Sequence, residues 1–168
     1  MPLSMHQASV PTFQQMLSSL SAILDKAAAH CLAKGIDPAD LIKAQLAPDM
    51  FPLPRQVQIA TDHAKGATAR LSGREVPKFE DTEQTLDELK ARIAKTLAFI
   101  QSVPAGELDG SEEKDVTITV GGQPRTLKGQ RYLFGNALPN FFFHVTTAYD
   151  ILRHKGVDVG KRDYMGTY

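Results

Sequence analysis

The sequence predicts an all-α fold, a four-helix bundle with a short β-hairpin before its last helix. Four long segments place apolar residues alternately three and four positions apart, which puts them on one face of a helix. These segments begin at Val10, Leu53, Leu86 and Leu138. Between the third and the fourth segment, residues 116–120 alternate apolar and polar side chains, as a half-buried strand does. The 168 residues, 42% of them apolar, are enough for one core, so we expect a single domain over residues 1–168.

Capping residues predict where the helices begin and end. Gly35 should end the first long helix, because glycine tolerates the positive φ of a C-terminal cap. Asp37 should cap a short second helix. Asp81 is expected to cap the third long helix, with Gln84 three residues later completing a capping box. The final helix is expected to begin within residues 136–139.

The hairpin is predicted from its turn. Gly121 and Gly122 can adopt the positive φ values of a two-residue turn, and residues 125–128 would return as the partner strand. A hairpin this short is marginally stable alone, so it should lie against the helices. Beyond the last helix, the C-terminal tail is expected to be anchored by Tyr164 and Tyr168.

Composition argues against several classes of protein. The 19 Lys and Arg residues balance 19 Asp and Glu residues, whereas a nucleic-acid-binding protein needs an excess of basic contacts. No apolar stretch approaches the roughly 18 residues that span a bilayer, so we expect no membrane partner. The only cysteine, Cys31, cannot form an internal disulfide, and the first ten residues lack the features of a signal peptide. A cytoplasmic location is expected.

Three polar side chains are candidates for a shared site. His63 lies about 60° from the apolar stripe of the second long helix, and His144 lies at the border of the stripe on the last one. Asn140 precedes His144 by one helical turn, so both can face the same point. If the two helices are neighbours, the three side chains converge on one cleft. The alternative is that each histidine bonds a neighbour or water at the edge of the core, and that Asn140 bonds local backbone.

Two segments and the hairpin carry a resemblance to a known superfamily. The segments are LAPDMFPLPRQVQIATDHAKGATARLSG, residues 46–73, and LPNFFFHVTTAYDILRHKGVDVGKRDYMG, residues 138–166. The chain resembles the DinB/YfiT-like superfamily of four-helix proteins regarded as metalloenzymes, and more closely one of its bacterial families of unknown function. The resemblance implies a divalent metal, often nickel or zinc. In that superfamily the second long helix supplies one histidine, and the last helix supplies two as H-x-x-x-H.

When the superfamily's ligands are matched to this sequence residue by residue, one of the three positions does not hold a histidine. His63 matches the first ligand, His144 matches the second histidine of the pair, and Asn140 occupies the position of the first. An amide oxygen is a poorer ligand for a transition metal than imidazole, so the implied site is a degenerate His-Asn-His set.

The resemblance implies one of two functions. The first is a metal-dependent hydrolase or a thiol-dependent transferase or isomerase. The alternative is a non-catalytic helical bundle that has lost its metal and binds a small ligand or a protein partner. A homodimer formed through a helix face is expected with either function.

Overall fold

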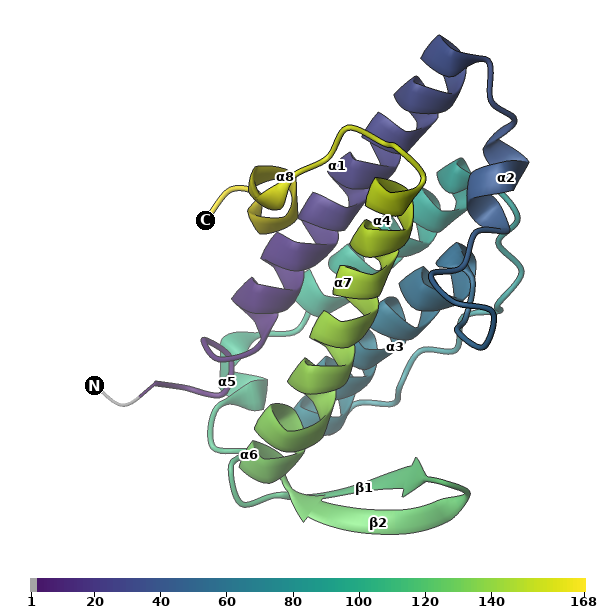
Figure 1. Cartoon of the computed structure of the whole chain (residues 1–168). Helices are drawn as coiled ribbons and strands as arrows, with labels where there is room; N and C mark the ends of the chain where they lie inside the picture. The colour runs from purple at the N-terminus through teal and green to yellow at the C-terminus, as the bar shows by residue number, and fades with distance from the viewer. Residues whose placement is uncertain (1–2) are drawn as a thin grey trace.

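The computed structural model describes residues 3–168 and is a bundle of four long helices (Figure 1). The long helices are α1 (Val10–Lys34), α3 (Leu53–Ser72), α4 (Leu86–Gln101) and α7 (Leu138–His154). A hairpin of β1 (Asp115–Val120) and β2 (Gln123–Lys128) lies across one end of the bundle. The short helical segments are α2 (Pro38–Ile42), α5 (Ala105–Leu108), α6 (Gly129–Tyr132), η1 (Leu133–Ala137) and α8 (Lys161–Met165). The predicted fold class is confirmed.

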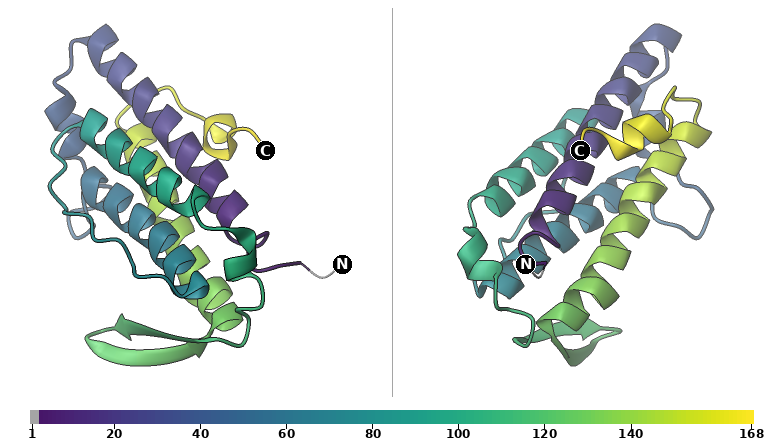
Figure 2. Two further views of the ribbon diagram at one scale, coloured as in Figure 1. Left: turned by 180° about the vertical axis from the view of Figure 1, so that it is seen from behind. Right: turned by 90° about the vertical axis from the view of Figure 1, so that its left-hand side faces the viewer.

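The helix that carries His63 and the helix that carries His144 are direct neighbours. Of all the pairs of helices, α3 and α7 pack together most extensively, and α3 also packs against α4. The first helix, α1, lies against α4 and α7, while α8 rests on the outside of α1 (Figure 2). None of the helices within residues 3–168 combines the length and the apolar character that crossing a bilayer requires.

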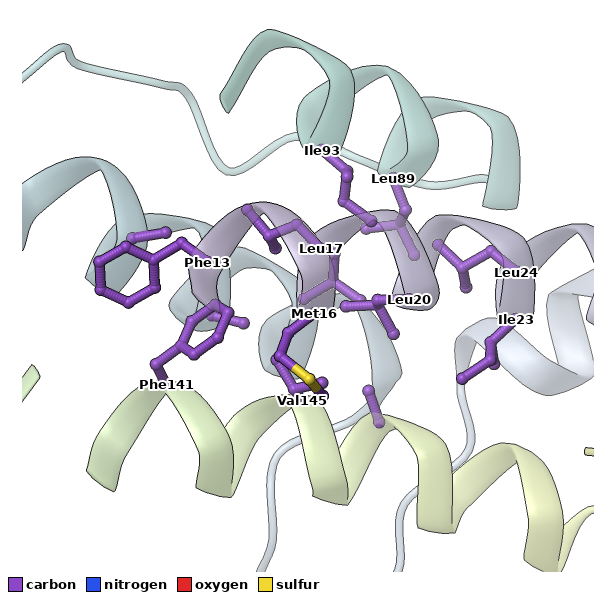
Figure 3. Close-up of a cluster of buried hydrophobic side chains, with 14 of the residues drawn as sticks. Phe13, Met16, Leu17, Leu20, Ile23, Leu24, Leu89, Ile93, Phe141 and Val145 are labelled. Carbon is purple, nitrogen blue, oxygen red and sulfur yellow. The ribbon is translucent and has the colours of Figure 1, made fainter. Parts of the chain in front are cut away.

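The core is built from the predicted stripes. Figure 3 shows α1 lying between α4 and α7, with Phe13 facing Phe141 and Leu17 close to Ile93. The rings of Phe13 and Phe141 meet edge to face, with centroids 4.8 Å apart. Each such fully buried side chain contributes about 1.5–3 kcal/mol by leaving water. The core therefore holds α1 and α7 in a fixed relation.

Small residues bring α3 close to its neighbours. Ala60, Ala64 and Ala67 have no exposed surface, as their positions on the predicted stripe require. Because alanine adds only a methyl group, a neighbouring helix can approach closely along this face. The short side chains therefore help to place His63 beside α7.

The glycine and aspartate caps of the first two helices are confirmed. Gly35 ends α1 with a φ of 63°, and the side chain of Asp37 accepts a hydrogen bond from the amide of Ala39 at 2.9 Å. Gly73 ends α3 in the same left-handed conformation.

The predicted cap of the third long helix is wrong. The cap of α4 is Thr85, and Glu88 completes the capping box by accepting from the amide of Thr85 at 2.9 Å. Asp81 lies four residues earlier and pairs instead with Arg55 at 2.6 Å and Arg92 at 3.0 Å. These ion pairs hold the chain before α4 in an extended course, so the helix begins later than predicted.

The hairpin turn follows from two glycines. Gly121 and Gly122 have φ values of 59° and 78°, which suits a two-residue turn between antiparallel strands. The partner strand begins at Gln123, opposite Val120, two residues before the predicted start. Val116 is buried at the base of the hairpin.

The last helix begins earlier than predicted. Helical structure runs without a break from Gly129 through α6 and η1 into α7. Pro139 has no amide hydrogen, and its ring crowds the carbonyl group of the preceding turn. The widened turn of η1 lies directly before Pro139 and accommodates it, so the proline does not mark the first turn of the helix.

One of the two predicted tail anchors is confirmed. The hydroxyl oxygen of Tyr164, in α8, lies 2.8 Å from that of Thr146, and its ring packs edge to face on Tyr149. Tyr168 is 92% exposed, so its predicted role as an anchor is wrong. The turn of α8 already fixes the tail through Tyr164, which leaves the chain end in solvent.

Candidate functional site

The structure brings His63 and His144 together. Their ring centroids lie 6.3 Å apart, and the ring planes differ by 12°. His144 is buried and His63 is half-buried. The two side chains come from α3 and α7, the most extensively packed pair of helices, so the bundle itself sets their separation.

A glutamine on α3 fixes the proton of His144. The Nε2 of Gln56 donates to the carbonyl oxygen of Phe51 at 3.0 Å, which leaves its Oε1 facing the ring of His144. That Oε1 lies 2.7 Å from Nδ1 of His144 and can only accept, so Nδ1 carries the proton. In a neutral ring the lone pair is then on Nε2. Metal-binding histidines are commonly held by such a bond from their other nitrogen.

Both histidines are uncharged at neutral pH. Burial, together with the neighbouring His144, lowers the pKa of His63 to about 4 from 6.5; Arg70 acts in the same direction and Asp62 opposes it. Burial also lowers the pKa of His144, and the charge of Arg55 adds to this. Neutral imidazole is the form that binds a metal or accepts a proton.

The side-chain amide of Asn140 is hydrogen-bonded through its nitrogen. Its Nδ2 donates to the carbonyl oxygen of Asn136, one turn earlier, at 2.7 Å. This is the local backbone bond that the sequence left open as an alternative. Within residues 3–168 the Oδ1 of Asn140 accepts no hydrogen bond, so an oxygen ligand remains available at this position.

His63 and Asn140 line one pocket of about 480 Å³ between the hairpin and the helices. Its lining consists of His63, Arg70, Tyr132, Asn136, Asn140, Ile118, Thr119, Val120 and Gly121. His144 lies outside this lining, beside His63. A pocket of about 490 Å³ at the other end of the bundle has no histidine in its lining, so we place the candidate site at the hairpin end (Figure 1).

The separation of the two rings is compatible with a shared metal ion only at its upper limit. Metal–nitrogen bonds of about 2 Å put each ring centre roughly 3.2 Å from a shared ion, so two such centres lie at most about 6.4 Å apart, and only when the ion lies on a straight line between them. The observed 6.3 Å is close to this limit. A tetrahedral site would need the rings to approach by about 1 Å. Across the described part of the chain, no third His, Cys, Asp or Glu side chain joins the pair.

Three neighbours of the site were not assigned a role from the sequence: Gln56, Arg70 and Tyr132. Arg70 follows His63 by seven residues, or about two helical turns, so the two lie on the same face of α3. That spacing could have identified Arg70 as a neighbour of His63 from the sequence alone. Gln56 carried no comparable signal, because its role depends on how α7 packs against α3.

The comparisons with known proteins agree with this architecture. Residues 5–165 match the family described as "Domain of unknown function (DUF1993)". The chain belongs to the DUF1993 family. It is also similar to a crystal structure of a DinB family member protein from Shewanella denitrificans, with 42% sequence identity and a TM-score of 0.88. That similarity covers 97% of this chain and 92% of the other. No curated protein matches the chain.

The DUF1993 match and the DinB family structure confirm the resemblance stated from the sequence. They identify the fold and the family. Neither comparison names a metal, a reaction or a ligand, so these have to be inferred from the residues of the site.

Proposed function

We propose that this DUF1993 protein uses His63, His144 and Asn140 to bind a divalent metal, nickel or zinc. The observation that carries the proposal is the arrangement of His144: its Nδ1 is committed to Gln56, its Nε2 lone pair is available, and the neutral ring of His63 lies 6.3 Å away. Asn140 would supply a third, weaker ligand through Oδ1. A site of this kind would serve a metal-dependent hydrolase or a thiol-dependent transferase or isomerase.

The roles of the protein groups follow from their contacts. A bound metal would act as a Lewis acid towards water or a thiol. Gln56 orients His144 and fixes its tautomer. Asn136 holds the amide of Asn140 through its backbone carbonyl group. The pocket gives a small molecule access to His63 and Asn140.

A second function is favoured by one observation. Among residues 3–168 the two histidines are joined by no third His, Cys, Asp or Glu, and the amide nitrogen of Asn140 is already bonded. A non-catalytic bundle that uses the same pocket for a small ligand or a protein partner would need no third metal ligand and no unbonded amide at Asn140. Metal affinity separates the two functions.

The test is a calorimetric titration of tag-free protein with nickel and zinc chloride. We expect binding of one ion per chain, lost in His63→Ala and in His144→Ala. Asn140→His should tighten binding at least about tenfold, because imidazole replaces the amide oxygen. His154→Ala, an exposed histidine on the same helix, is the matched control. Absence of binding in the wild type, or binding insensitive to both alanine variants, would leave the non-catalytic function.

We also propose that the protein acts in the cytoplasm as a homodimer. Phe51, before α3, and Phe143, on α7, are each 55% exposed, and burying these two rings in an interface would favour association. Light scattering after gel filtration should give twice the chain mass of 18.4 kDa. A mass of one chain at all concentrations tested would exclude the dimer.

A further inference from the structure

Arg70 places an unpaired positive charge at the pocket. Its guanidinium is half-buried and has no carboxylate partner in the described part of the chain; its one side-chain hydrogen bond is from Nη1 to the hydroxyl oxygen of Tyr132, at 3.3 Å. Arg92 is the contrasting case. Its side chain is 1% exposed and is compensated by ion pairs with Asp62 and Glu83, so its role is structural. Arg70 lacks such compensation.

A glycine in the middle of α3 makes room for this guanidinium. A Cβ atom added at Gly66 would lie 2.5 Å from Nη1 of Arg70, so the flexible end of the Arg70 side chain would have to move away. Arg70 therefore folds back along its own helix, over Gly66 and towards His63. Glycine inside a helix costs about 1 kcal/mol relative to alanine, and at position 66 it leaves the guanidinium of Arg70 room to lie against the helix.

The surroundings of Arg70 suit a bound anion. Arg70 is the one charged residue of the pocket lining, which contains no Asp or Glu. Tyr132 is 1% exposed, and burial raises the pKa of its hydroxyl, so it stays protonated. Because Tyr132 accepts from Arg70, its own hydrogen is free to donate to a ligand. The side chains of Asn136 and Asn140 add neutral polar groups.

We propose that Arg70 and Tyr132 form an anion subsite that binds the carboxylate of a small-molecule substrate beside His63. The proposal rests on the proposed function, because it assigns the substrate class of the same pocket. A guanidinium matches a planar carboxylate with two parallel hydrogen bonds. One positive charge balances one carboxylate, whereas a phosphate dianion would keep an uncompensated charge in a half-buried pocket.

The test uses matched pairs of probes on the full chain. Benzoate and butyrate are titrated against benzamide and butyramide, and binding is followed by calorimetry and by the NMR signals of His63. Both carboxylates should bind more tightly than their amides. Arg70→Gln should weaken carboxylate binding at least about tenfold, because a charge-assisted hydrogen bond is lost. Gly66→Ala should weaken it less, by displacing the guanidinium. Arg153→Gln, an exposed arginine on α7, is the control.

The outcomes separate this proposal from the metal site. Each titration is repeated without added metal and with nickel. Carboxylate binding that depends on Arg70 in metal-free protein supports the subsite even if nickel does not bind. Equal affinity of benzoate for wild type and Arg70→Gln, with both proteins folded by circular dichroism, overturns the subsite while leaving nickel binding intact. Tighter binding of inorganic phosphate than of either carboxylate overturns the assignment to carboxylates.

Discussion

When the pH is lowered from 7 to 5, the free energy of unfolding should fall by about 2 kcal/mol less in His63→Gln than in the wild type. Burial, assisted by the neighbouring His144, lowers the pKa of His63 from 6.5 to about 4 in the folded protein. At pH 5 the unfolded chain therefore binds a proton at His63 and the folded chain does not. Unfolding takes up that proton, so the free energy of unfolding falls as the pH falls below 6.5 and continues to fall towards pH 4. Integrating the two titration curves from pH 7 to pH 5 gives about 2 kcal/mol.

The assay is urea denaturation at pH 7 and at pH 5 for the wild type, His63→Gln and the control His154→Gln. The quantity compared is the loss of unfolding free energy between the two pH values. The wild type and the control should lose about 2 kcal/mol more than His63→Gln. His144 contributes in the same direction, because its pKa is also lowered, and it remains in all three proteins. Equal acid losses in the wild type and in His63→Gln would refute the burial argument.

Two further substitutions test the packing around the site. Arg92→Met should lower the free energy of unfolding by about 3 kcal/mol, because Glu83 and the two other paired carboxylates lose their buried partner; a loss below that of the exposed control Arg153→Met would contradict this. Thr85→Ala should lower the free energy of unfolding by about 1 kcal/mol, because α4 loses its N-terminal cap. Asp81→Ala, at the position predicted from the sequence, removes no helix cap. Urea denaturation at pH 7 measures both.

The helices were predictable because burial imposes a regular spacing on the sequence. Leu17 and Leu89, for example, lie on stripes that only a buried helix face explains. The cap of α4 could have been predicted, because Thr85 followed by Glu88 is the usual capping-box pattern, whereas Asp81 with Gln84 is a variant of it. The ion pairs that Asp81 forms with distant arginines could not have been predicted from the same rule.

The predicted start of the last helix was wrong for a local reason. Pro139 is favoured in the first turn of a helix, and this predicted a start within residues 136–139. The structure instead absorbs the proline in the widened turn η1 and continues the helix back to Gly129. Tyr132 lies before the predicted start, although it is a buried helical residue that lines the pocket.

The site was partly predictable. The positions of His63 and His144 at the borders of two stripes predicted that they would lie close together if their helices were neighbours. The structure supplies that condition, because α3 packs against α7. The hydrogen bond from His144 to Gln56 was not predictable, because it depends on side-chain conformations across the α3–α7 interface. The pocket itself depends on how the hairpin docks against the helices, which the sequence pattern does not specify.

The central claim is that His63 and His144 act together as metal ligands, and elemental analysis of protein purified without a His tag tests it most directly. We expect about one nickel or zinc ion per chain in the wild type and in the exposed control His154→Ala, and a loss of that metal in both His63→Ala and His144→Ala. Folded wild-type protein that contains no metal and takes up none from added nickel or zinc would contradict the claim.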